Sequence, residues 1–192
     1  MAKKYEFRPD KPRSGLLSKL YLTQKQRRSL LKWSLYGLTL LVLSILQDVV
    51  FCHLDILGAT TQLVPCGIFL ICILEGIHTG SVFALVASRL YLFSGTAPGA
   101  YAMVLLVVLA VVLCVFRQAY LQKDFFSVVL CTAVGMLAYE MCVFAMGLFL
   151  GLTTGGRIVG FCVTAILSAL ASPLLYPIAA AIRSVGGEVW KE

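Results

Sequence analysis

The sequence predicts an all-α integral membrane protein, a bundle of six transmembrane helices with both termini in the cytoplasm. Three observations predict this class. Hydrophobic residues make up 60% of the 192 residues and charged residues only 13%, whereas a soluble domain is about 45–50% apolar and about 25% charged. The mean hydropathy is +0.92. The apolar residues also lie in long runs, and a helix needs about 20 of them to cross the hydrocarbon core.

Three runs form the N-terminal half of the expected bundle. Gln47 and Asp48 are the strongly polar residues of the first run, and the third carries His78 and Arg89. Polar residues and Pro65 at the start of the second run leave its first residue open. The expected helices cover residues 33–51, 56–74 or 62–74, and 76–93.

Turns and a polar loop separate the remaining runs. Gly95, Pro98 and Gly99 indicate a turn before the fourth run. Residues 117–124 form a polar loop after it. Glu140 is the charged residue of the fifth run, and the sixth run has none. The expected helices cover residues 100–116, 125–150 and 158–182.

Basic residues are concentrated before the first run. Ten Lys and Arg residues precede residue 33, against two acidic residues, so the positive-inside rule places this end in the cytoplasm. Six crossings return the C-terminus to the same side. The basic tail is expected to face anionic lipid rather than nucleic acid, and residues 14–32 form either an interfacial helix or a flexible lead-in. The expected parts are a basic cytoplasmic or interfacial tail 1–32, a six-helix transmembrane domain 33–183 and a short cytoplasmic tail 184–192.

Three ionisable residues are expected to share one layer of the membrane. At 1.5 Å per helical residue, Asp48, Arg89 and Glu140 each fall about 20–22 Å from the inner ends of their helices. Charged groups at membrane depth are expensive and often functional. The hypothesis is therefore a buried cluster of one arginine between two carboxylates, either a structural ion pair or a ligand or proton site.

Small residues recur at every fourth position of the third run. Gly76, Gly80, Ala84 and Ser88 share one helix face, so a neighbouring backbone can approach closely along this helix-packing stripe. The neighbour is either another helix of this chain or a helix of a partner.

A polar turn and two prolines complete the candidate features. Glu75 and His78 fall at the expected cytoplasmic turn between the second and third helices, where Glu75 can cap the third helix. A solvated turn is expected there rather than a metal or proton relay. Pro173 and Pro177 predict a kink in the sixth helix, because each removes a backbone donor.

Enzymatic motifs are absent from the sequence. It contains no G-x-S-x-G, no Walker loop and no metal-spaced cluster of His and Cys. Seven cysteines lie mostly in apolar runs without a C-x-x-C pair, as small hydrophobic residues do. These patterns predict a protein that is not an enzyme and needs no metal or cofactor.

Three segments resemble MreD, the multispanning rod-shape-determining protein of bacteria. They are QDVVFCHLDILG at 47–58, the small-residue stretch EGIHTGSVFALVASRLYLFSGTAPGA at 75–100, and SALASPLLYPI at 168–178, which is similar to the family's final helix. The likeness covers most of residues 40–182. Ala84 and Ser88 stand where the family has glycines.

The resemblance implies a non-enzymatic scaffold of the cell-elongation complex, in the bacterial plasma membrane. Its implied partners are an MreC-like single-span protein, the actin-like MreB, and RodA with its penicillin-binding protein. MreD is also distantly similar to the substrate-binding S subunit of energy-coupling-factor vitamin transporters, which is the alternative. An S subunit is expected to carry an Ala-x3-Ala stripe on its first helix and ligand groups in its outer half. The first run lacks that stripe, which favours the scaffold.

Overall fold

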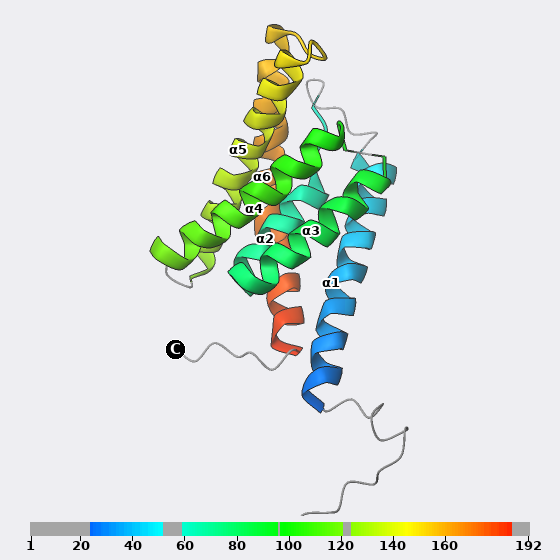
Figure 1. The fold of residues 1–192 in the computed structure, drawn as a ribbon, viewed down its shortest axis with the longest axis vertical. Coiled ribbons are helices and arrows are strands. Elements are labelled where there is room, and N and C mark those ends of the chain that lie inside the picture. The colour runs from blue at the N-terminus through cyan, green and yellow to red at the C-terminus, as the bar shows by residue number, and fades with distance from the viewer. Residues whose placement is uncertain (1–23, 52–58, 96, 121–123, 186–192) are drawn as a thin grey trace, which may run out of the picture.

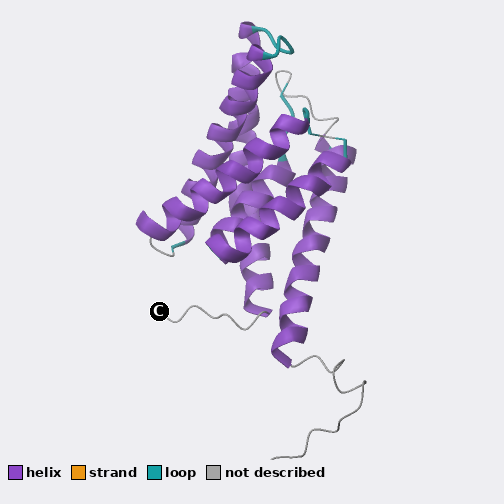
Figure 2. Cartoon of the chain, in the orientation of Figure 1, coloured by secondary structure: helices purple, strands orange, loops and turns teal. Residues whose placement is uncertain are grey.

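The computed structural model describes residues 24–51, 59–95, 97–120 and 124–185. Figure 2 shows that these residues form helices joined by short turns, with no strand among them. The all-α prediction is therefore confirmed for this part of the chain. The helices are α1 (Gln24–Val49), α2 (Leu63–Glu75), α3 (Ile77–Phe93), α4 (Ala100–Tyr120), α5 (Phe125–Phe149), the short η3 (Gly155–Arg157) and α6 (Ile158–Val185).

Successive helices run up and down through one bundle. α1 begins and α6 ends at the same end of the molecule (Figure 1), which we call the proximal end. The opposite end, where α1 ends and α2 begins, is the distal end. α5 and α6 extend beyond the other helices at the distal end (Figure 1).

The short helix α2 is the centre of the bundle. It packs against all five of the other long helices, and its residues from Leu63 to Leu74 are all buried. Its sequence, LVPCGIFLICILE, is apolar on every side, which is typical of a helix surrounded by protein. The remaining helices form a shell around it and expose large apolar side chains on their outer faces.

A tight hairpin joins α2 to α3. Gly76 is the single residue between the two helices, and its φ of +90° is a conformation that favours glycine. The hairpin brings the two backbones into close contact, since a Cβ added at Gly80 would lie 2.8 Å from the carbonyl oxygen of Cys72. The Cys72 thiol also donates a hydrogen bond to the Gly80 carbonyl oxygen at 3.1 Å.

Four helical segments are long and apolar enough to span a membrane: Gln26–Val49, Ala100–Gln118, Phe125–Phe149 and Gly155–Val185. α2 and α3 are shorter apolar helices of 13 and 17 residues, about 20 and 26 Å long at 1.5 Å per residue. Six principal helices are thus found in the described residues where six were expected, while the crossing of a membrane by any of them remains a prediction.

Helix boundaries differ from the predicted ones mainly at α1. It begins at Gln24, nine residues before the expected start at residue 33, so residues 24–32 of the predicted tail belong to the first helix. α2 begins at Leu63, next to the later of the two expected starts. Residues 1–23 and 186–192 lie outside the described residues, and with them most of both predicted tails and most of the expected interfacial helix.

The two prolines lie inside the continuous helix α6. Pro173 lacks the N–H that would bond the carbonyl of Ala169, four residues earlier. The hydroxyl of Ser172 donates to that carbonyl oxygen at 2.7 Å instead. A neighbouring serine is one way in which a membrane helix tolerates proline, and α6 continues to Val185.

The cysteines behave as small core residues. The six described cysteines are free, and four of them are buried (Cys66, Cys72, Cys114 and Cys131). The Cys114 thiol donates to the carbonyl oxygen of Cys72 at 3.2 Å and so links α4 to α2. Cys52 lies outside the described residues.

Candidate functional site

Polar side chains gather at the two ends of α2. Because α2 is surrounded by protein, the amide groups at its start and the carbonyl groups at its end have no free access to water. A helix also carries partial positive charge at its N-terminus and partial negative charge at its C-terminus. The neighbouring helices must satisfy both ends with side chains, and they do so differently.

An ion pair closes the proximal end of α2. The ammonium of Lys32 in α1 lies 2.7 Å from Oε2 of Glu75, the last residue of α2, and the two side chains are only 7% and 1% exposed. The hydroxyl of Tyr36 donates to Oε1 of the same carboxylate at 2.8 Å. Both carboxylate oxygens are therefore bonded, and the Lys32 ammonium also lies 5.2 Å from the centre of the Trp33 ring.

Two arginines add positive charge at the same end. Arg117 of α4 donates a hydrogen bond to the carbonyl oxygen of Ile73 in the last turn of α2. Arg183 of α6 lies within electrostatic reach of Arg117. Cations near a helix C-terminus interact favourably with the helix dipole. We call Lys32, Tyr36, Glu75 and Arg117 the proximal ion cluster.

At the distal end, neutral side chains accept hydrogen bonds from the start of α2. Oε1 of Gln47 in α1 accepts from the amide of Val64 at 3.0 Å. The amide of Gln62, just before α2, donates to the hydroxyl of Ser168 in α6 at 2.8 Å. The hydroxyl of Tyr91 in α3 donates to Oε1 of Gln62 at 3.4 Å. Uncharged groups from α1 and α6 thus cap the start of α2, and Tyr91 of α3 bonds the side chain of Gln62.

The same distal region holds a carboxyl group without a partner. Glu140 of α5 is fully buried, and neither of its side-chain oxygens has a hydrogen-bond partner. The hydroxyl of the adjacent Tyr139 is also buried and lies beside the Tyr91 hydroxyl. Glu140 and Asp48 both lie within electrostatic reach of the Tyr91 hydroxyl. We call Gln47, Gln62, Tyr91, Tyr139 and Glu140 the distal polar cluster.

The predicted cluster of Asp48, Arg89 and Glu140 does not form. Asp48 and Arg89 are exposed on the outer faces of α1 and α3, whereas Glu140 points into the core. The lack of any partner for Glu140 excludes a bond from Arg89. The prediction of equal depth ignored the direction in which each side chain leaves its helix. Arg89 lies in the last two turns of α3 and is exposed there.

The predicted cytoplasmic turn is also corrected in part. His78 is exposed, as expected of a solvated turn. Glu75, however, does not cap α3 but ends α2, and its carboxylate is buried against Lys32. Gly76 occupies the cap position before α3 and makes no side-chain bond. Lys32 was assigned to the tail, so the sequence analysis missed this pair.

The helix-packing stripe faces the interior of this chain. Gly80, Ala84 and Ser88 are buried, and Gly80 is the point of closest approach to Cys72 of α2. Gly76 is the hinge before the helix rather than part of its face. The sequence left open whether this face packs against a helix of this chain or of a partner. At Gly80, the neighbour is α2 of this chain.

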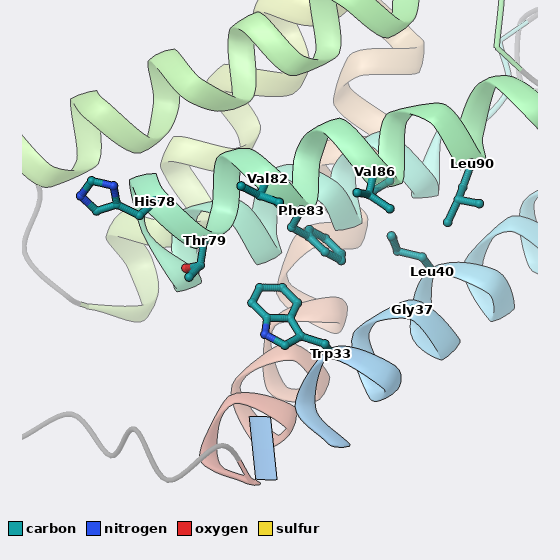
Figure 3. A pocket seen from close by; sticks show the side chains of 10 residues that line it. Trp33, Gly37, Leu40, His78, Thr79, Val82, Phe83, Val86 and Leu90 are labelled. Atoms are coloured by element: carbon teal, nitrogen blue, oxygen red, sulfur yellow. The ribbon is translucent and has the colours of Figure 1, made fainter. Parts of the chain in front are cut away.

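An apolar groove runs along the outside of the bundle between α1 and α3. α1 packs mainly against α2 and α6 and touches α3 only slightly, so a gap of about 450 Å³ remains between them. Figure 3 shows Trp33 of α1 and Phe83 of α3 pointing toward each other near its proximal end; their ring centres are 5.6 Å apart. We call this feature the α1–α3 groove, and it is lined by Trp33, Gly37, Leu40, His78, Thr79, Val82, Phe83, Val86, Ala87 and Leu90.

The groove continues toward the distal end. A further space of about 340 Å³ shares Gly37, Leu40 and Leu90 with it and reaches Ser44 and Phe93. Gly37 leaves the α1 wall open, since a Cβ added there would meet nothing within 4 Å. The groove therefore offers a bare stretch of helix backbone flanked by apolar side chains.

Comparison with known proteins gives no identification: no family model, no curated protein and no solved structure matches this chain.

Several residues at these sites escaped the sequence analysis. The inner face of α1 buries three polar residues that are separated by whole helical turns: Lys32, Tyr36 and Gln47. That spacing is the helical period, so a helix begun before residue 33 would have placed them on one face. No comparable local signal marks Arg117, whose partner lies 44 residues away.

Proposed function

We propose that this chain is a non-enzymatic membrane scaffold of the bacterial cell-elongation complex, the assembly that maintains rod shape during peptidoglycan synthesis. It acts in the plasma membrane by holding the transmembrane helix of an MreC-like single-span protein. The α1–α3 groove is the observation that carries the proposal, because it is an apolar, open and elongated surface on the outside of the bundle. The resemblance to MreD supplies the identity of the complex.

The groove suits a helix as its occupant. Helix association in lipid depends on close packing at small residues more than on hydrophobicity. Gly37 provides such a position in the α1 wall, with open space in front of it. A partner helix lying along the groove would cover both of its parts, from Trp33 at one end to Phe93 at the other.

The proposed orientation places the proximal end in the cytoplasm. The exposed Arg27 and Arg28 lie in the first turns of α1, and Arg117 and Arg183 lie at the same end in α4 and α6. Arg157 in η3 and Arg89 in the last two turns of α3 lie toward the distal end. This asymmetry supports the positive-inside orientation. In it, the chain crosses six times, both termini are cytoplasmic, and the basic N-terminal tail faces anionic lipid.

The remaining partners are proposed from the resemblance alone. They are MreB beneath the membrane, and RodA with its penicillin-binding protein within it. In this role the chain performs no chemistry and needs no cofactor or metal. Depletion of the protein is accordingly expected to make rod-shaped or ovoid cells rounder.

A substitution in the groove tests the proposal. A Cβ added at Gly37 meets nothing within 4 Å, and the groove offers space beyond it, so for Gly37→Leu we expect normal amounts of folded protein but reduced recovery of the MreC-like partner from detergent extracts. The control is Ala145→Leu, which places the same leucine side chain on an exposed face of α5 and should leave recovery unchanged.

Two results would contradict the proposal. Unchanged partner recovery with Gly37→Leu would exclude the groove as the docking surface. Co-purification of the chain with a bound vitamin, or with the ATPase pair of a transporter, would favour the S subunit of an energy-coupling-factor transporter instead.

A further inference from the structure

The distal polar cluster contains a buried carboxyl group without a hydrogen-bond partner. Both side-chain oxygens of Glu140 have no hydrogen-bond partner, although the residue is fully buried. An isolated carboxylate inside a membrane protein is very unfavourable unless it is paired. A carboxyl group kept in this position holds either a proton or a positively charged occupant.

No cation from the described part of the chain fills that role. Toward Glu140 and Tyr91 the surrounding helices present only oxygen-bearing groups or a second acid: Gln47 and Asp48 from α1, Gln62 from the start of α2, and Tyr139 from α5. Arg89 is exposed on the outer face of α3. Lys32 and Arg117 are bonded to the opposite end of α2.

We propose that the distal polar cluster binds one small monovalent cation, with the Glu140 carboxylate as its charged ligand. The phenols of Tyr91 and Tyr139, which both lie within electrostatic reach of Glu140, are the neutral candidate ligands. Carboxylate, hydroxyl and amide oxygens are the donors that hard cations prefer.

The charge of the site favours a monovalent ion over a divalent one. Glu140 is the buried carboxylate of the cluster, whereas Asp48 is exposed. The described residues include no group of three or more His, Cys, Asp or Glu side chains that could hold a metal ion. Divalent ions usually require several carboxylates or several retained waters. One buried negative charge matches one positive charge.

The nearby start of α2 does not oppose a cation strongly. A helix N-terminus carries partial positive charge through its unbonded amide groups. Here the amides of Gln62 and Val64 already donate to Ser168 and Gln47, and Pro65 has no amide hydrogen. The amides at the start of α2 are therefore largely occupied. The proposal concerns the interior of the bundle and does not depend on the α1–α3 groove or on its partner.

Thermal unfolding of the purified full-length chain in detergent tests the site. The protein is compared in NaCl, in KCl and in choline chloride at equal concentration, with choline as a cation too large for a packed core. We expect Na⁺ or K⁺ to raise the Tm above the choline value, by an amount that grows with the logarithm of the cation concentration above the Kd.

Variants separate a specific site from a general salt effect. Glu140→Gln should abolish the difference between Na⁺ and choline, and Tyr139→Phe should weaken the apparent affinity. Asp124→Asn removes an exposed carboxylate from the start of the same helix and should leave the response intact. Tyr176→Phe, a phenol at the proximal end of α6, should do the same.

Any one of three results would overturn the proposal. Equal Tm values in NaCl, KCl and choline chloride would exclude the cation site. An equal response in Glu140→Gln would assign any ion effect to another place. A Tm that depends on pH but not on Na⁺ or K⁺ would show that Glu140 holds only a proton.

Discussion

A buried acid lies near each end of α2, and the two acids differ in their hydrogen bonds. At the proximal end the Glu75 carboxylate receives a bond on each oxygen, from Lys32 and from Tyr36. At the distal end the Glu140 carboxyl receives none. Both acids are buried at the centre of the same bundle. The comparison teaches that burial alone does not tell whether the fold satisfies the hydrogen bonds of an acid.

Breaking the proximal ion pair should have the largest effect on stability. Lys32→Ala leaves Glu75 buried with only Tyr36 as a partner, and removal of one member of a buried pair costs about 3–5 kcal/mol. Chemical unfolding in detergent micelles measures the loss. Lys32→Met combined with Glu75→Leu removes both charges and should recover most of the stability. Equal losses in the single and double variants would show that the charges do not interact.

Disrupting the close approach of α3 to α2 should have the second-largest effect on stability. Gly80→Leu places a Cβ 2.8 Å from the Cys72 carbonyl oxygen, a backbone atom that cannot turn aside. Overpacking of this kind costs about 1–3 kcal/mol. The hairpin that sets the position of both ends of α2 would then loosen. Gly37→Leu, on the open wall of α1, is the matched variant and should unfold like the parent protein; similar losses in the two would contradict the assigned packing.

Removing a cap at the distal end should have the smallest effect. Ser168→Ala leaves the amide of Gln62 without its acceptor. Polar contacts between membrane helices are worth about 0.6 kcal/mol on average, far less than the proximal ion pair. The same unfolding experiment detects the difference. A loss as large as that of Lys32→Ala would mean that neutral caps hold α2 as firmly as charges do.

Much of the fold could be predicted from the sequence. The apolar runs gave six helices, the small residues of α3 gave a close packing face, and the uniform apolarity of α2 is the pattern of a buried helix. The polar sites could not be predicted in the same way. Depth along a helix placed Asp48, Arg89 and Glu140 in one layer, but the direction of each side chain depends on which neighbour its helix faces.

The Lys32–Glu75 ion pair could not be predicted from the local sequence either. Lys32 and Glu75 are 43 residues apart, and each has an ordinary local explanation, one in a basic tail and the other in a polar turn. Only the packing of α1 against the end of α2 brings them together. Contacts of this kind are set by tertiary structure, and local periodicity does not contain them.

The most direct test of the central claim compares one substitution at the two ends. We would measure the free energy of unfolding of Glu75→Gln and of Glu140→Gln against the parent protein, in choline chloride so that no small monovalent salt cation is present. The account predicts a large loss for Glu75→Gln, because the buried Lys32 loses the carboxylate charge that it pairs with, and no loss for Glu140→Gln, because an unbonded acid stabilises nothing. An equal loss for both variants would contradict it.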